Sequence, residues 1–203
     1  KILNPKKGSK ADLLIMAYEN AKSTFLKEQK QSHSREELLL DLKEKLKLNN
    51  YPEVIECYDN SHISGSNPVS VMISFTNGIY DKSRVRKYHL STEKVFDDLK
   101  GFEEALLRRF KNTELSLPDL IIIDGGKTQL RVAQEALKAQ NIINVDLIAL
   151  TKEKGRHDLG MSQEKVYLPN KDEPIVLSRK SNILFLLQSI RDEDIRGYLV
   201  DWD

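Results

Sequence analysis

Two apolar segments of this chain each end on an aspartate. Residues 54–58 lead to Asp59, and residues 120–123 lead to Asp124. Segments of this kind are typical of central strands in a sheet that is covered on both faces. Carboxylates at the ends of two such strands would lie at one rim of the sheet, where open α/β folds hold their sites. Since close carboxylates repel unless a cation lies between them, we expect Asp59 and Asp124 to bind Mg²⁺ or Mn²⁺ and to support phosphate-ester chemistry.

The residues next to these aspartates also allow purely structural interpretations. Asp59 could cap an Asx-type turn, and His62 could be hydrogen-bonded locally instead of orienting a ligand or touching phosphate. The segment Asp124-Gly-Gly-Lys127 is more specific. Its glycines let the backbone approach a ligand, and the helix start with Lys127 attracts phosphate. A plain strand-to-helix turn is the alternative, and the spacing excludes a nucleotide-binding P-loop.

Basic residues cluster on a further expected strand, residues 84–90. Alternation along that strand places Arg84 and Arg86 on one face, and Lys87 follows them. Basic side chains near a carboxylate rim suit contacts to a nucleic-acid backbone, whereas a charged, solvated edge strand is the structural alternative. Asp98 falls in the first turns of the next expected helix, where acids complement the helix dipole.

Hydrophobic periodicity and turn signals predict the elements that position these residues. We expect helices at 9–30, 34–48, 93–111, 127–140 and 181–197, and strands at 54–59, 69–76, 84–90, 119–123, 145–150, 165–168 and 174–177. Three strands followed by alternating helices and strands predict an antiparallel meander extended by parallel strands. The expected fold is therefore α/β: a ribonuclease H-like mixed sheet flanked by helices in residues 51–203, preceded by a helical arm in residues 1–50.

Composition sets broad limits on function. The 203 residues include 32 Lys and Arg against 31 Asp and Glu, so any basic surface must come from local segregation of charge. The single cysteine, Cys57, excludes a disulfide framework and a Cys-rich zinc site. No apolar stretch approaches the roughly twenty residues of a membrane span, and the first residues show no signal-peptide pattern. We expect a cytoplasmic protein with no membrane contact, and the missing initial Met suggests a piece of a longer chain.

Five segments together resemble the C-terminal endonuclease domain of the UvrC family of bacterial nucleotide excision repair. They are IECYDNSH (55–62), VRKYHL (85–90), FDD (96–98), PDLIIIDGGK (118–127) and IRDE (190–193). The resemblance implies a metal-dependent, ribonuclease H-like domain that cuts the damaged strand of double-stranded DNA 5′ of a lesion, together with a UvrB-type partner whose contact module lies outside this chain. It also implies that Asp59 and Asp124 are catalytic and that Asp98 is a further functional aspartate.

The chain departs from the family at one catalytic position. The family has a histidine two residues after Arg-Asp-Glu, and this chain has Ile195 there. Isoleucine cannot bind a metal or move a proton, so we expect Asp194, about 100° away around a helix, to replace it. Other candidates are Asp192, Glu193, His62 and His157. The alternative function is a weakened or inactive module that binds DNA or a partner, and action on RNA–DNA hybrids is a weaker alternative that only the fold supports.

Overall fold

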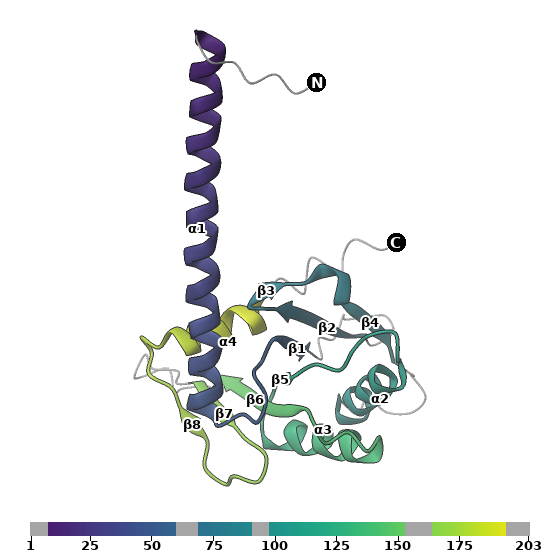
Figure 1. The fold of residues 1–203 in the computed structure, drawn as a ribbon. Coiled ribbons are helices and arrows are strands. Elements are labelled where there is room, and N and C mark those ends of the chain that lie inside the picture. The colour runs from purple at the N-terminus through teal and green to yellow at the C-terminus, as the bar shows by residue number, and fades with distance from the viewer. Residues whose placement is uncertain (1–7, 60–68, 91–97, 153–163, 194–203) are drawn as a thin grey trace. The chain divides into compact units, whose positions relative to one another are not determined.

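The computed structural model describes residues 8–59, 69–90, 98–152 and 164–193 (Figure 1). The chain divides into two compact units, residues 1–37 and residues 38–203. None of the helices in the described part of the chain combines the length and apolar character that a membrane span requires. The boundary that we expect near residue 50 stays a prediction.

Helix α1 runs from Ser9 to Leu46 without interruption. The prediction of two helices that meet near residues 30–34 is therefore wrong. No glycine or proline stands at the expected break, and polar residues alone do not stop a helix. An i,i+4 pair of His33 Nε2 and Glu37 Oε1, 3.1 Å apart, extends from this region toward the next turn and supports the continuous helix.

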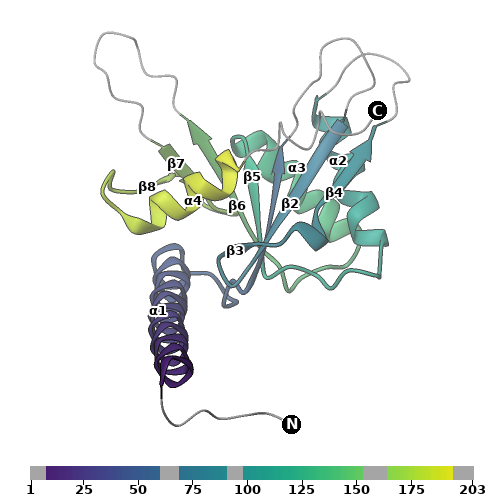
Figure 2. The same ribbon diagram turned by 90° about the horizontal axis from the view of Figure 1, so that it is seen from above.

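The second unit is built on one mixed sheet of eight strands (Figure 2). The strands are β1 (Val54–Asp59), β2 (Val69–Thr76), β3 (Ile79–Tyr80), β4 (Arg86–His89), β5 (Leu120–Asp124), β6 (Asp146–Lys152), β7 (Glu164–Tyr167) and β8 (Ile175–Val176). Their order is β3-β2-β1-β5-β6-β7-β8, and β4 also pairs with β2. The pairs β1–β5 and β5–β6 are parallel and the others are antiparallel, which confirms the predicted meander with a parallel extension.

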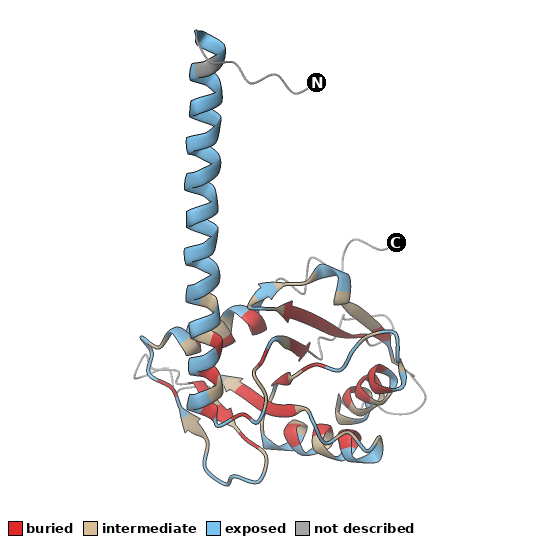
Figure 3. Ribbon diagram, viewed as in Figure 1, coloured by how far each residue is buried: buried red, intermediate tan, exposed pale blue. Residues whose placement is uncertain are grey.

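Helices cover both faces of this sheet, and each face buries its own apolar core (Figure 3). Helices α2 (Asp98–Lys111) and α3 (Lys127–Ala139) pack on one face. Helix α4 (Asn182–Asp192) packs on the other, where it meets the last residues of α1. Those last residues contribute Leu39, Leu42 and Leu46, each at most 1% exposed. Burying one leucine contributes about 2 kcal/mol, so the end of α1 belongs to the core of the second unit.

The strand expected at residues 84–90 begins two residues late. Asn77 and Gly78 both have positive φ, 52° and 71°, and they form the predicted tight turn between β2 and the unpredicted short strand β3. A 3₁₀ turn (Lys82–Arg84) follows before β4 starts at Arg86. Arg84 therefore lies outside the strand, and the prediction that it shares a strand face with Arg86 is wrong.

Asp81 holds the corner between β3 and the 3₁₀ turn. Its carboxylate accepts hydrogen bonds from Ser83 Oγ (2.6 Å), from the Ser83 N–H (3.1 Å) and from Thr76 Oγ1 (3.0 Å). The bond from the Ser83 side chain is the largest cause that lowers the pKa of Asp81 below its ordinary value. A lowered folded-state pKa means that this stabilisation is present above the unfolded pKa and is lost as the pH falls through the folded pKa.

We expect Asp81→Ala to lower the free energy of unfolding by about 1 kcal/mol at neutral pH, as for loss of a cap. The difference from the parent should shrink as the pH is lowered below about 4, the ordinary Asp pKa. Urea denaturation of both proteins at a series of pH values measures this difference. A difference that is the same at every pH would contradict the assignment.

Candidate metal and nucleic-acid site

The sheet register brings the two predicted aspartates together. Strands β1 and β5 run parallel, with Ile55 beside Leu120 and Tyr58 beside Ile123. One step further along each strand come the last residues of both, Asp59 and Asp124. Neighbouring strands lie about 4.8 Å apart. Strands β1 and β5 therefore end side by side on two aspartates.

A basic residue occupies the same row across the sheet. Asp59 pairs with Val71 of β2, and Val71 pairs in turn with Lys87 of β4. On the other side, Asp124 pairs with Leu150 of β6. Residues that pair directly across strands share a face, and Val71 and Leu150 are buried in the core on the α4 face. Lys87, Asp59 and Asp124 therefore occupy positions of one row on that face of the sheet.

The turn after Asp124 has the form that its sequence predicts. Asp124 is exposed at the end of an otherwise buried strand. The Gly125 N–H donates to Leu150 O at 3.1 Å, which continues the parallel ladder by one bond. Helix α3 begins at Lys127, whose side chain is exposed, with its Nζ 6.0 Å from the centroid of the Tyr167 ring. The expected connection of a buried strand to a helix through two glycines is confirmed.

The two glycines of this turn differ in the space around them. A Cβ at Gly125 would lie 2.9 Å from Cδ and 3.1 Å from Cβ of Gln129, whereas the nearest atom to a Cβ at Gly126 is Gln129 Oε1 at 4.0 Å. Gln129 matters because its Oε1 accepts the Gly126 N–H at 3.1 Å. An added methyl group at Gly125 would therefore push away the Gln129 side chain, which accepts the hydrogen bond of the Gly126 N–H at the start of α3.

We expect Gly125→Ala to lower the free energy of unfolding by about 1 kcal/mol through loss of this hydrogen bond. The matched variant Gly126→Ala, which meets open space at an extended φ of −106°, should stay within about 0.5 kcal/mol of the parent. Chemical denaturation of the three proteins provides the comparison. Equal losses for the two alanine variants would be inconsistent with the role of Gln129.

The structure describes only part of the other predicted acidic and histidine residues. Asp98 is the first residue of α2, and the structure describes its backbone but not its side chain, as for Asp59. His62, Asp194 and Ile195 lie outside the described residues. Within the described side chains, no group of three or more His, Cys, Asp or Glu residues could hold a metal ion. The metal centre that we expect thus rests on Asp124 and on the backbone register.

The predicted basic residues have distinct surroundings. Arg86 donates from Nη1 to the carbonyl oxygens of Ser83 (2.9 Å) and Val85 (2.8 Å). Arg84 turns inward: its Nη2 donates to Ser116 O at 2.8 Å, and its side chain is only 13% exposed. Lys87 is half-buried on the edge strand β4. All three residues are half-buried.

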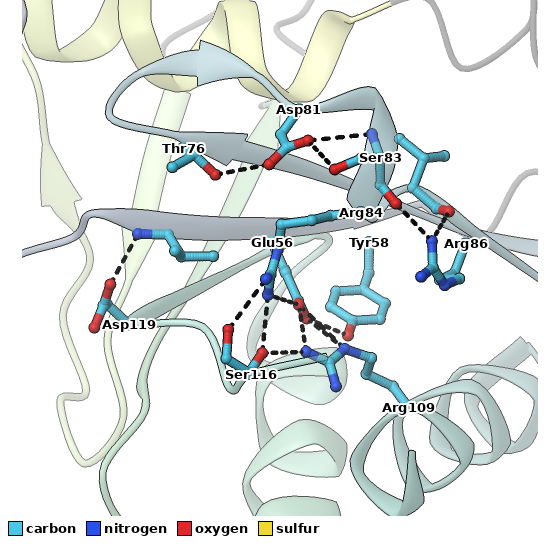
Figure 4. A network of polar contacts seen from close by, with 12 residues as sticks. Glu56, Tyr58, Thr76, Asp81, Ser83, Arg84, Arg86, Arg109, Ser116 and Asp119 are labelled. Atoms are coloured by element: carbon cyan, nitrogen blue, oxygen red, sulfur yellow. Dashed lines mark hydrogen bonds and ion pairs between the residues drawn. The ribbon is translucent and has the colours of Figure 1, made fainter. Parts of the chain in front are cut away.

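A buried ionic network on the α2 face was not predicted (Figure 4). Glu56, in the middle of β1, and Arg109 of α2 are 0% and 1% exposed. Arg109 Nη2 lies 2.7 Å from Glu56 Oε1, and its Nε lies 3.2 Å from Oε2. Tyr58 also donates its hydroxyl to Glu56 Oε2 at 2.9 Å. The sequence signal for this network is a charged residue inside an apolar strand, but the partner lies 53 positions away.

Burial and charge act together on the groups of this network. Burial, and then the charge of Glu56, raise the pKa of Tyr58 well above its ordinary value, so its hydroxyl remains a donor. Burial alone would lower the pKa of Arg109, but the hydrogen bonds and charge of Glu56 raise it overall. Burial raises the pKa of the neighbouring Tyr88 to about 12. Tyr58, Tyr88 and Arg109 therefore keep their protons throughout the physiological pH range.

The Arg-Asp-Glu segment contains a second buried pair. Arg191 Nη1 lies 2.9 Å from Glu164 Oε1, and Arg191 Nε donates to Asp192 Oδ1 at 2.8 Å. Burial opposes the charged form of Arg191, but the hydrogen bonds to Asp192 and Glu164 raise its pKa overall. Glu164 is the first residue of β7 and pairs with Lys152 at the end of β6. Arg191 thus ties the end of α4 to the rim of the sheet where Asp124 lies.

A groove with a volume of about 840 Å³ lies elsewhere. It is lined by residues at the end of α3, at the start of β6 and after β7, including Leu137, Asp146 and Pro169. These residues are at the opposite end of the parallel strands from Asp124. The groove is therefore separate from the candidate site.

The strand order, the helices on both faces and the paired strand-end aspartates define an α/β domain of the ribonuclease H-like class. The family model described as the UvrC RNAse H endonuclease domain matches residues 43–196. The chain belongs to this family, as its sequence motifs predict.

Full-length relatives agree with this assignment. The chain is 46% identical over 191 residues to the UvrABC system protein C of Protochlamydia amoebophila (strain UWE25), which covers 93% of this chain and 31% of that protein. It is 37% identical over 199 residues to the protein of the same name from Geobacter metallireducens, with coverages of 95% and 32%. The chain thus spans about a third of the length of these relatives.

Solved structures give distant similarities. Human endonuclease V has a TM-score of 0.37 and 8% identity, covering 71% of this chain and 81% of that one. Endonuclease V of Ciona intestinalis, in complex with a 24mer DNA containing an inosine, has a TM-score of 0.36 and 13% identity, with coverages of 74% and 82%.

Proposed function

We propose that this chain is the metal-dependent endonuclease domain of an excision-repair protein, and that it cuts the damaged strand of double-stranded DNA 5′ of the lesion. The observation that supports this proposal most is the register that ends β1 and β5 side by side on Asp59 and Asp124. Carboxylate oxygens are the ligands that Mg²⁺ and Mn²⁺ prefer, and two carboxylates at that spacing favour a cation between them. The donor set therefore fits the expected metal.

The acidic residues divide into metal ligands and a proton-transfer group in this proposal. Asp59 and Asp124 would hold the cation, and Asp98 would add a direct or water-mediated ligand from the start of α2. A bound divalent cation supplies charge for the scissile phosphate and lowers the pKa of a bound water. Asp194 takes the place of the family histidine and accepts or donates a proton. Most of the rate enhancement then comes from positioning and charge neutralisation.

The basic residues fix the DNA strand beside these carboxylates. Lys87 lies two strand spacings from Asp59 in the same row, about 10 Å, and a lysine side chain can extend over much of that distance toward a phosphate. Lys127 at the start of α3, Arg86 and His62 provide further phosphate contacts, and Arg84 supports them from the interior of the domain. Contacts of this kind make binding strongly salt-dependent.

We place the domain in a cytoplasmic complex with a UvrB-type partner on lesion-containing DNA. The relatives in which this segment recurs bear the name UvrABC system protein C, and they are about three times as long as this chain. The partner's contact module would then lie outside these residues.

A nicking assay tests the proposal. The domain, in its full-length protein with the partner subunits, is given 5′-labelled duplex DNA with one lesion and Mn²⁺. We expect one product that ends 5′ of the lesion and that disappears with EDTA. Cleavage by Asp59→Ala at the parent rate, or cleavage only on the 3′ side, would overturn the proposal.

The second candidate function is a module that binds DNA or a partner without efficient cleavage, and Ile195 is the observation that favours it. We expect Ile195→His to raise the cleavage rate by about 10²-fold, at the low end of the range for a general acid–base group. The same assay under single-turnover conditions measures the change, with Ile195→Gln as a control that adds polarity without a titratable group. An equal rate for Ile195→His and parent would mean that another residue already performs the task.

A further inference from the structure

One buried carboxylate connects the chain segments that carry three of the four proposed catalytic aspartates, Asp59, Asp98 and Asp124. Glu56 lies in β1, three residues before Asp59. Its Oε1 is within 2.7 Å of Arg109 Nη2 and 3.1 Å of Arg109 Nε, and its Oε2 accepts the Tyr58 hydroxyl. The residue is 0% exposed, so these partners take the place of solvent around its charge.

Arg109 links this carboxylate to the other two segments. It lies in the last turn of α2, and the first residue of that helix is Asp98. Its Nη2 also donates to Ser116 O at 2.8 Å, and Arg84 Nη2 donates to the same oxygen at 2.8 Å. Ser116 belongs to the connection that leads into β5 and so to Asp124 (Figure 4).

Arg108 makes a second directional contact from α2, because its Nη1 donates to His89 O at the end of β4 at 2.5 Å. The helix buries Phe102, Ala105, Leu106 and Phe110 against the sheet and α3. Apolar burial is non-directional, so it does not by itself select one orientation of the helix. A planar guanidinium that meets a carboxylate with two nitrogens accepts a narrow range of positions. The Glu56–Arg109 pair is thus a directional contact that joins α2 to β1, the strand that ends on Asp59.

We propose that Glu56 and Arg109 are positioning residues for the metal site. They hold α2 against β1 so that Asp98 stays at a fixed distance from Asp59 and Asp124. This inference rests on the proposed function, because it assigns a purpose to the position of Asp98. A buried ion pair often stabilises a fold no better than apolar residues of similar volume. We therefore assign the Glu56–Arg109 pair the task of fixing the position of α2, and not that of stabilising the fold.

The test compares Arg109→Lys with Leu106→Ala in the full-length protein. Arg109→Lys keeps the charge and loses the two-nitrogen geometry. Leu106→Ala removes an apolar contact of the same helix and leaves the network intact. Mn²⁺ binding is measured without DNA by the loss of the free-ion electron paramagnetic resonance signal, and unfolding is measured by urea denaturation. Cleavage rates at varied Mn²⁺ concentration then separate the half-saturating concentration from the maximal rate.

We expect Arg109→Lys to weaken Mn²⁺ binding about tenfold, the usual effect of losing a group that orients metal ligands. Leu106→Ala should destabilise the fold and leave the Mn²⁺ affinity unchanged. Equal shifts in both variants, or no shift in either, would overturn the positioning role. Glu56→Gln, which keeps the shape of the side chain, replaces Arg109→Lys in the comparison if the latter does not fold.

The outcomes separate this inference from the proposed function. A parent protein whose Mn²⁺ binding does not depend on Asp124 contradicts the proposed function itself. If Asp124→Asn abolishes Mn²⁺ binding and Arg109→Lys binds Mn²⁺ as tightly as the parent, only the positioning role is contradicted.

Discussion

Asp124→Asn should lower the rate of Mn²⁺-dependent cleavage by about 10³-fold. Asparagine keeps the size of the side chain and one oxygen, but it removes the negative charge that holds the cation. A metal ion contributes several kcal/mol to transition-state stabilisation, and each 1.4 kcal/mol is a factor of about ten in rate. The measurement is the single-turnover nicking rate of the full-length protein on lesion-containing duplex.

The same substitution at the start of β5 provides a matched control. Asp119 precedes this strand, and its Oδ2 accepts the Val54 N–H at 2.8 Å, a bond that an asparagine oxygen can also accept. We expect Asp119→Asn to cleave at nearly the parent rate. Equal losses in the two variants would show that the strand, and not the charge at its end, limits activity.

Glu56→Leu should cost about 3–5 kcal/mol of stability, because it leaves the Arg109 guanidinium buried without its carboxylate. Domains of this kind are stable by only about 5–15 kcal/mol, so the loss should be plain in urea denaturation. Glu56→Leu/Arg109→Leu, which removes both charges, should recover much of it. A double variant no more stable than Glu56→Leu would contradict this account.

An exposed pair of the same composition provides the control. Arg131 and Glu135 lie on the surface of α3, 3.8 Å apart, with side chains 74% and 67% exposed. Exposed pairs contribute about 0–1 kcal/mol. Glu135→Leu should therefore change stability far less than Glu56→Leu, and a similar loss at both sites would mean that burial does not set the cost.

Local signals predicted much of the fold. The bounds of β1 and β2 are those expected from apolar runs and turn residues, and the start of α3 follows from the two glycines before Lys127. Local signals failed where no residue type marks a boundary, as in the middle of α1. They also failed before β4, where the turn made by Asp81 delays the strand and moves Arg84 out of it.

The site was only partly predictable, because its key relations are non-local. Strand-end aspartates could be read from the sequence, but their alignment depends on the register of β1 against β5, which a shift of one residue would destroy. The position of Lys87 in the row of Asp59 depends on two such registers. The partnership of Glu56 with Arg109 has no local signal beyond the unusual placement of each charge.

The burial of Leu39, Leu42 and Leu46 against the α4 face has a practical consequence for dissecting this protein. A fragment that starts at residue 51 would lose four leucines from one core, Leu39, Leu42, Leu46 and Leu48, and would expose the apolar surface that they cover. Exposed apolar surface of that kind promotes self-association. The smallest fragment that keeps this hydrophobic face closed therefore begins before Leu39, inside the long helix and not at the end of it.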